Sequence, residues 1–267
     1  MNLILLEQEE LRHDNTAILR EQRATHIRRV LAAAPGNTIR IGIVDGAVGT
    51  ARIDALDDTS VTLSCTLHEV PPRPPVDLLL ALPRPKVTRR LFAQCAALGV
   101  DRLMLTNASR VERDYFDTHI LSPDVYRPLL IEGLQQARDT RLPRISVHRQ
   151  FRILVEDVLD DWAPLATRVV ADPGEHQRLH SVVLAARPDR LLLALGPDGG
   201  WNDFERRLLE SRGFTPISMG MRTLRSDTAC VALLALAHDA LGRIREASPR
   251  TDHAPAMARE HTGAPVS

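Results

Sequence analysis

From residue 77 onward, short apolar runs alternate with amphipathic stretches. The apolar runs predict buried strands, and apolar residues at a spacing of three or four predict helices. Strand and helix in this order are typical of a parallel sheet with connecting helices. The predicted elements are strands at 77–82 and 102–106, helices at 88–98 and 123–136, a strand and a loop within 144–162, and a short strand at 169–173.

The N-terminal part has a different pattern. Apolar and polar residues alternate over 37–53, with a turn at Asp45-Gly46, and 60–69 predicts another strand. Residues 26–33 have helical spacing. These elements predict a small β-barrel.

Four prolines within 70–77 (VPPRPPVD) stiffen the chain and remove backbone donors, which is typical of a domain boundary. The last residues are rich in Pro, Ala, Thr and charge without periodicity. We therefore expect a barrel domain at 1–72, an α/β domain at 73–246 and a disordered tail at 247–267.

Two segments near the C-terminus predict a ligand site. In 191–201 (LLLALGPDGGW) a buried strand runs into a glycine-rich turn, which Asn202 or Asp203 can follow as the cap of a helix at 203–212. A strand at 215–218 then leads through a second loop into an apolar helix at 227–241. Either loop alone is typical of an ordinary connection. Both together favour a pocket, because ligands of open α/β sheets bind beyond the carboxyl ends of the strands.

Composition narrows the class of protein. The chain has 267 residues, of which 44% are hydrophobic, enough for a sizeable core. No stretch approaches the ~20 apolar residues of a membrane span, and the acidic N-terminus lacks the basic region of a signal peptide, so we expect a cytoplasmic protein. Cys65, Cys95 and Cys230 lie far apart in apolar contexts and predict core residues. His176 and His180 lack the glutamate of a helical zinc pair, and no metal is expected.

Charge is unevenly distributed along the chain. The net charge is zero overall, but it is −3 over 1–72, +5 over 73–150 and −2 over 151–267. Arginine outnumbers lysine 33 to 1. Guanidinium groups suit phosphate recognition, but an arginine-only set is more typical of a GC-rich genome than of selection for phosphate binding. Charge alone therefore leaves a nucleic-acid partner open.

Motif sequences in the two loops carry a family resemblance. GPDGGW followed by GMRTLRSDTA resembles the paired signature of the ribosomal RNA small subunit methyltransferase E family, and 24–36 (ATHIRRVLAAAPG) and 80–100 (LALPRPKVTRRLFAQCAALGV) resemble two of its other elements. The resemblance implies a SPOUT-type α/β trefoil knot with a small N-terminal PUA-like β-barrel. It also implies bound S-adenosylmethionine, a homodimer, and methylation of N3 of a uridine in the decoding region of 16S rRNA, on naked rRNA or the small ribosomal subunit.

The same resemblance implies site residues. Those expected at the cofactor are Leu195, Gly196, Pro197, Asp198, Gly199, Gly200, Met219, Gly220, Met221, Leu224, Arg225 and Thr228. Those expected at the RNA are His26, Arg28, Arg29, Lys86, Arg110 and Arg141. Ala97 and the segment 135–139 (QQARD) depart from the family pattern, which leaves open a non-catalytic or retargeted RNA-binding protein that acts on another RNA.

Methylation of N3 requires an acceptor nitrogen that has lost its proton. A cation that stabilises the anionic base, or a carboxylate that receives the proton, would assist. Arg225 is our candidate stabiliser and Asp227 our candidate proton acceptor, with Arg110 as a further cation. Asp198 is a weaker candidate for the base, because the same carboxylate could instead cap the following helix. For Arg225 the alternative is a salt bridge to Asp198 or Asp227. A nucleotide-dependent oxidoreductase is disfavoured, because neither GxGxxG nor GxxxxGK[ST] occurs.

Overall fold

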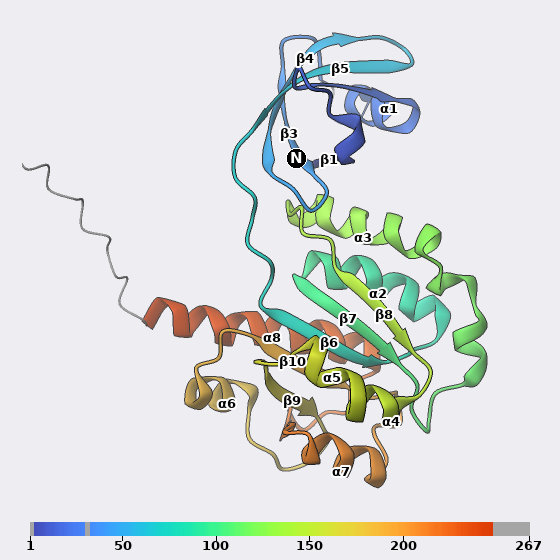
Figure 1. Cartoon of the computed structure of the whole chain (residues 1–267), viewed down its shortest axis with the longest axis vertical. Helices are drawn as coiled ribbons and strands as arrows, with labels where there is room; N and C mark the ends of the chain where they lie inside the picture. Colours follow the sequence, from blue (N-terminus) through green and yellow to red (C-terminus); the bar gives the residue numbers. More distant parts are fainter. Residues whose placement is uncertain (1–2, 30–32, 248–267) are drawn as a thin grey trace, which may run out of the picture.

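Two sheets of different kinds are stacked end to end along the long axis of the molecule (Figure 1). The computed structural model describes residues 3–29 and 33–247. In the N-terminal sheet β1 is parallel to β3 and the other neighbours are antiparallel, in the order β1-β3-β4-β5-β2. Its strands are β1 (Ile4–Leu6), β2 (Thr16–Arg20), β3 (Thr38–Ile43), β4 (Val48–Leu56) and β5 (Ser60–Leu67).

Alternate residues of these strands face a small core of their own. Ile39, Ile41 and Ile53 are buried there together with Ile27 of α1 (Glu21–Arg29). The result is a half-barrel with β1 and β2 at its edges. The turn predicted between β3 and β4 is confirmed, because Asp45 adopts the left-handed conformation (φ 56°) that a tight hairpin favours.

The second sheet is parallel throughout, with the order β11-β9-β10-β6-β7-β8. Every residue of the two central strands, β6 and β10, is buried, and these strands are apolar throughout except for Asp77 in β6. The strands are β6 (Val76–Ala81), β7 (Val100–Thr106), β8 (Arg144–His148), β9 (Thr167–Ala171), β10 (Leu191–Leu195) and β11 (Thr215–Ile217).

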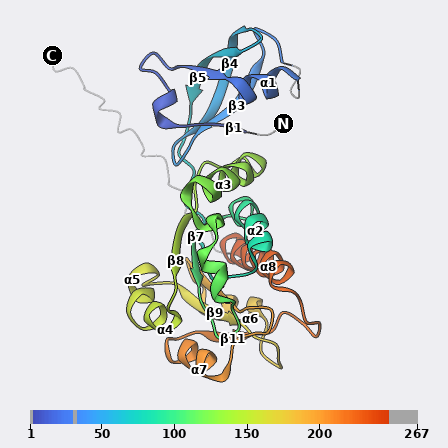
Figure 2. The same cartoon turned by 90° about the vertical axis from the view of Figure 1, so that its right-hand side faces the viewer.

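Helices cover both faces of the parallel sheet (Figure 2). On one face lie α2 (Pro85–Ala97) and α8 (Ser226–Ala247), and α3 (Pro123–Ala137) packs against α2. On the other lie α4 (Phe151–Ile153) and α5 (Leu159–Trp162), joined by the π-helical turn η4 (Leu154–Val158). The remaining helices are α6 (Leu179–Ala186), beside α8, α7 (Asp203–Ser211), and the short 3-10 turns η1 (Gln8–Glu10), η2 (Arg113–Asp117) and η3 (His119–Leu121).

Some sequence predictions require correction. The loop expected before residue 162 is instead helical over Phe151–Trp162, because the π turn inserts an extra residue that breaks the regular spacing of Leu154, Val155 and Leu159, all fully buried. The strands β1 and β2 and the helix α6 were not predicted. The first helix begins at Glu21 rather than His26, and residues 30–32 of the expected segment lie outside the described residues.

The last helix is longer than its apolar pattern predicts. It ends at Ala247 rather than Leu241, and the rest of the expected tail, 248–267, lies outside the described residues. Cys65, Cys95 and Cys230 are buried and not disulfide-bonded, as predicted. Within 3–29 and 33–247, no helix is long and apolar enough to cross a membrane.

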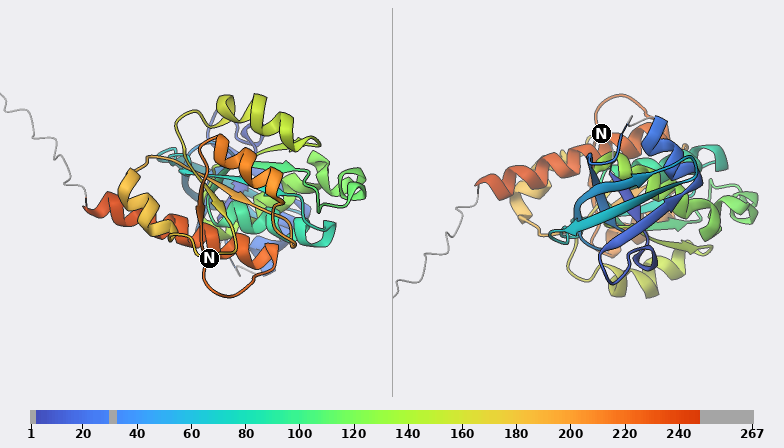
Figure 3. Two further views of the ribbon diagram at one scale, coloured as in Figure 1. Left: turned by 90° about the horizontal axis from the view of Figure 1, so that it is seen from below. Right: turned by 90° about the horizontal axis from the view of Figure 1, so that it is seen from above.

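The N-terminal sheet lies above α3 and the start of β8 at one end of the molecule (Figures 1 and 3). The β3–β4 turn docks on residues 138–143, where the backbone N–H of Asp45 donates to the carbonyl of Thr140 (2.7 Å) and the Thr140 hydroxyl donates to that of Gly46 (2.6 Å). Arg73, in the proline-rich linker, donates to the carboxylates of both Asp45 and Asp101 (2.9 Å each). The two sheets are therefore joined by an ordered polar contact.

Candidate functional site

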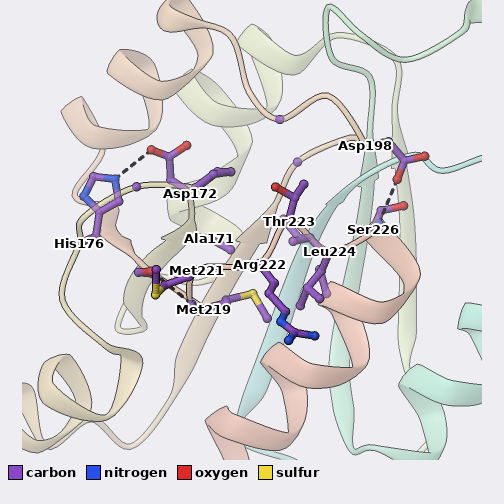
Figure 4. A pocket seen from close by; sticks show the side chains of 18 of the residues that line it. Ala171, Asp172, His176, Asp198, Met219, Met221, Arg222, Thr223, Leu224 and Ser226 are labelled. Atoms are coloured by element: carbon purple, nitrogen blue, oxygen red, sulfur yellow. Dashed lines mark hydrogen bonds and ion pairs between the residues drawn. The ribbon is translucent and has the colours of Figure 1, made fainter.

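A cavity of about 540 Å³ lies beyond the carboxyl ends of β9, β10 and β11 (Figure 4). Its walls are the three loops that follow these strands, residues 172–178, 196–202 and 218–225. Leu195, Met219 and Leu224 supply apolar surface, while Asp172 and Asp198 supply carboxylates at opposite sides. A volume of this size, apolar with a few polar groups, suits a small organic ligand.

The glycine-rich loop after β10 forms a tight turn. The N–H of Gly200 donates to the carbonyl of Pro197 (2.7 Å), and Gly200 has a φ of +72°, in the left-handed region that favours glycine. Asn202 then caps α7, accepting from the N–H of Glu205 (2.8 Å), while the Glu205 carboxylate accepts from the N–H of Asn202 (2.8 Å). The prediction of a cap at this position is confirmed at Asn202.

Asp198 points from this turn to the start of α8 (Figure 4). Its carboxylate accepts from the N–H of Ser226 (2.9 Å). This hydrogen bond, with the positive charges of Arg84 and Arg225, lowers the pKa of Asp198 and outweighs the opposing effect of burial. Asp198 therefore binds the N-terminus of a helix, as one alternative predicted. The helix is α8, however, and not α7, which follows Asp198 in the sequence.

The loop before α8 is open toward the cavity. Gly220 has a φ of +124°, and a side chain there would meet the guanidinium of Arg178 at 3.5 Å. Met221 is fully exposed, whereas Met219 packs against the core of the parallel sheet. This wall therefore combines an anchored methionine with an exposed one.

Across the cavity from Asp198, His176 and Asp172 form a pair that the predicted site residues did not include (Figure 4). Nε2 of His176 lies 3.0 Å from a carboxylate oxygen of Asp172, which is also 3.6 Å from Nη1 of Arg206. Gly174 leaves room for the ring, because a Cβ there would lie 2.9 Å from Nε2 of His176. The signal in the sequence is the polar segment 172–176 (DPGEH) directly after a buried strand.

Most residues expected at the cofactor do line this cavity. They are Leu195, Gly196, Pro197, Asp198, Gly200, Met219, Gly220, Met221 and Leu224. Gly199, Arg225 and Thr228 are not among the lining residues. Asp227 forms an ion pair with Arg90 of α2 (2.8 Å), and the exposed Arg225 has no ion pair within the described part of the chain.

The residues expected at the RNA are divided between the two ends of the molecule. His26, Arg29 and Lys86 are exposed. Arg28 forms an ion pair with Asp58, and Arg141 donates to the carbonyl of Asp45 (2.9 Å). Arg110 donates to the carbonyls of Gly199 and Gly200. No cluster of His, Cys, Asp and Glu that could hold a metal ion occurs in 3–29 and 33–247.

A pocket at the strand ends of a parallel sheet, lined by glycine-containing loops, is typical of α/β proteins that bind a small organic ligand. Comparison with known proteins identifies the family. Residues 71–238 match the model of the RNA methyltransferase domain. The chain is 32% identical over 260 residues to the ribosomal RNA small subunit methyltransferase E of Treponema pallidum, covering 89% of this chain and 92% of that protein. It is 29% identical to the protein of the same name from Synechocystis sp., covering 82% and 72%. The chain belongs to the ribosomal RNA small subunit methyltransferase E family.

Solved structures agree on the fold. A ribosomal RNA small subunit methyltransferase E from Neisseria gonorrhoeae, bound to S-adenosyl methionine, superposes with a TM-score of 0.72 at 18% identity, covering 90% of this chain and 97% of that one. A methyltransferase from Legionella pneumophila, in complex with the same cofactor, gives 0.68 at 21% identity, covering 90% and 98%. Both sheets are therefore part of the shared architecture.

Proposed function

We propose that this protein transfers a methyl group from S-adenosylmethionine to N3 of a uridine in 16S rRNA, in the decoding region of the small ribosomal subunit. The observation that carries the proposal is the cavity formed by the two signature loops together, in a chain of this family. The relatives' names support small-subunit rRNA as the substrate. The position on the base rests on the motif resemblance.

The cavity fits the cofactor. Its apolar surface at Leu195, Met219 and Leu224 suits an adenine ring, and Gly196 and Gly200 let the backbone approach a ligand closely. We assign the cofactor contacts to the nine lining residues of the expected set, with Asp172 as an added polar contact. Gly199, Arg225 and Thr228 act from outside the cavity wall. When bound, S-adenosylmethionine supplies a methyl group on a positively charged sulfur.

Arg225 is the residue to which we assign stabilisation of the deprotonated base. It is exposed at the start of α8, near enough to Asp198 to lower the pKa of that carboxyl, and it is not neutralised by an ion pair with any described residue. A cation in this state can interact with a developing negative charge on the uracil ring. Asp227 remains the candidate proton acceptor, although its ion pair with Arg90 draws it toward α2. That contact makes Asp227 the weaker of the two assignments.

We further propose that the α/β domain contains a trefoil knot, that the N-terminal half-barrel is a PUA-like RNA-binding domain, and that the protein acts as a cytoplasmic homodimer. Meeting of the loops 172–178, 196–202 and 218–225 at one cavity supports the knot. The half-barrel lies beyond β8, whereas the loops that line the cavity follow β9, β10 and β11 on the other side of the sheet (Figure 1). An RNA that contacts both would therefore be served best by two copies. Leu184 and Leu236, 53% and 46% exposed on the adjacent helices α6 and α8, are suitable contact residues for the second copy.

A second candidate is a SPOUT-fold RNA-binding protein that has lost catalysis or acts on another RNA. It is favoured by the changed segment 135–139, whose continuation, residues 138–143, docks the β3–β4 turn in this protein. A change there can alter how the half-barrel is presented to RNA. Retained affinity for S-adenosylmethionine without transfer would identify this case.

The test is mass spectrometry of nucleosides from 16S rRNA of a strain that lacks the gene. The strain is compared with the same strain complemented by wild type or by Arg225→Ala. We expect loss of N3-methyluridine, restored by wild type alone. Unchanged N3-methyluridine in the deletion strain would refute the target, and full restoration by Arg225→Ala would refute the role of that arginine.

A further inference from the structure

Arg110 contacts the glycine-rich loop directly. It lies in the loop after β7, and its Nη1 donates to the carbonyl oxygens of Gly199 and Gly200, the latter at 3.3 Å. These residues are about 90 positions apart in sequence and meet because β7 and β10 both flank β6. The sequence resemblance places Arg110 among the RNA-binding residues, which the contact does not favour.

A second contact ties the same two segments together. The backbone N–H of Ser109 donates to Oε1 of Glu205 (2.6 Å). Glu205 is only 4% exposed, and its other oxygen accepts from the N–H of Asn202. Residues 109–110 therefore hold the stretch 199–205 at both its beginning and its end.

The turn has two sides with different roles. Gly196, Pro197, Asp198 and Gly200 line the cavity, whereas Gly199 does not. Arg110 binds the carbonyl of Gly199, which is not a lining residue, and the carbonyl of Gly200, which is one. Hydrogen bonds from a guanidinium are charge-assisted and about twice as strong as neutral ones, so they fix the peptide planes from which the inner wall is built.

We propose that Arg110 is a positioning residue for the cofactor loop. This inference rests on the proposed function, because it takes the ligand of the loop to be S-adenosylmethionine. Arg110 acts through the backbone of residues 199–200 and need not touch the cofactor or the RNA.

The position of the Arg110 side chain also favours glycine at position 199. A Cβ at Gly199 would lie 2.7 Å from Cδ of Arg110, closer than real Cβ atoms approach other atoms, although the φ of Gly199 is not in the left-handed region. A side chain at position 199 would therefore displace the exposed side chain of Arg110, whereas glycine at position 200 is favoured by its own backbone conformation. Gly199 and Arg110 therefore form one unit.

Titration calorimetry with S-adenosylmethionine tests the proposal on the full-length protein. We expect Arg110→Ala to weaken binding about ten-fold, the size of effect that follows from losing hydrogen bonds made by a charged group. Arg110→Lys should recover part of the loss, because lysine keeps the charge but not the fork. The matched control is Arg113→Ala, an exposed arginine of the same connection without an ion pair among the described residues, which should bind like wild type.

Hydrogen exchange without cofactor gives an independent readout. Amides of 199–202 should exchange faster in Arg110→Ala than in wild type or Arg113→Ala, while amides of the core strands keep their protection. Gly199→Ala should also weaken cofactor binding. The double variant should lose no more than the worse single variant, because the clash and the contact involve the same pair.

Unchanged cofactor affinity and exchange in Arg110→Ala, with a raised KM for RNA, would overturn the proposal and return Arg110 to the RNA-binding set. Additive losses in the double variant would also contradict it. If wild type itself does not bind S-adenosylmethionine, the proposed function fails. Faster exchange in 199–202 would then still report that Arg110 braces the loop.

Discussion

The two ends of the parallel sheet are both rich in arginine but use it differently. Where the strands begin, the carboxylates of Asp77 and Asp101 are completely buried, and several guanidinium groups surround them. Where the strands end, Asp198 is bound by a backbone N–H, and Arg84 and Arg225 have no ion-pair partner among the described residues. The first end is an internal charge network, and the second carries exposed guanidinium groups that form no ion pair with any described residue.

Asp101 is the centre of the network. It accepts from Arg73 (2.9 Å), Arg144 (2.8 Å) and Arg190. Burial alone would raise its pKa, but the hydrogen bonds from Arg190 and Arg73 outweigh burial and lower it. Asp77, without a hydrogen-bond partner for its carboxylate among the described residues, shows the opposite balance, because burial raises its pKa to about 6. Hydrogen bonds from guanidinium groups therefore distinguish the two buried carboxylates, because Arg190 also lies 3.5 Å from Asp77 but donates no hydrogen bond to it.

The largest effect is expected from removal of that centre. Asp101→Ala should lower the free energy of unfolding by about 3–5 kcal/mol, because guanidinium groups would remain partly buried without their counter-charge. Urea denaturation measures this change. Asp239→Ala is the matched control, since it breaks an exposed ion pair with Arg243 within one helix and should cost about 0.5 kcal/mol. Equal losses in the two variants would mean that water already solvates the arginines around Asp101.

At the other end of the sheet, the effect should appear in rate and not in stability. Arg225→Ala should lower kcat about 100- to 1000-fold, as expected for loss of one group that stabilises charge in the transition state. Its denaturation midpoint and its affinity for S-adenosylmethionine should be close to wild type, because Arg225 does not line the cavity. Single-turnover methylation with Arg207→Ala, an exposed arginine of α7, as control measures the change. A fall in cofactor affinity with unchanged kcat would make Arg225 a cofactor ligand.

The raised pKa of Asp77 predicts a pH dependence of stability. An aspartate titrates near 4 in an unfolded chain, so between about 4 and about 6 the folded protein holds more protons than the unfolded one. Stability contributed by the protonated carboxyl is therefore lost as pH rises through this window. Relative to Asp77→Asn, wild type should become less stable by up to about 3 kcal/mol and then remain constant. Denaturation curves from pH 4 to 8 measure the difference, and a flat difference would contradict the assignment.

Local patterns predicted the strands of the parallel sheet and the two loops, because apolar runs and glycine turns are signals within a few residues. They could not predict which arginines are free to bind a ligand and which are bound to other groups of the protein. Arg110 and Arg141 are as polar in sequence as Lys86, yet their partners are carbonyl groups of segments about 90 residues away, brought near only by the fold. Helix 151–162 was missed for a related reason, since its π turn breaks the regular period. The sequence shows His176 and Asp172 in one polar segment, but the structure is needed to show that the two side chains pair and line the cavity.

The smallest expected effect separates a structural arginine from an available cation. Arg141→Ala removes a hydrogen bond to the carbonyl of Asp45 between the two sheets, and should cost about 1 kcal/mol of stability. Its RNA affinity should keep the salt dependence of wild type.

Lys86→Ala should behave in the opposite way, because Lys86 is exposed at the start of α2 and has no ion pair among the described residues. Its stability should be unchanged, and the slope of log affinity against log salt should fall by roughly 0.7, the value for one phosphate contact to single-stranded RNA. A reduced slope in Arg141→Ala would show that this arginine leaves Asp45 to bind RNA. Arg141 would then belong with the cations that contact RNA and not with the arginines that hold the fold together.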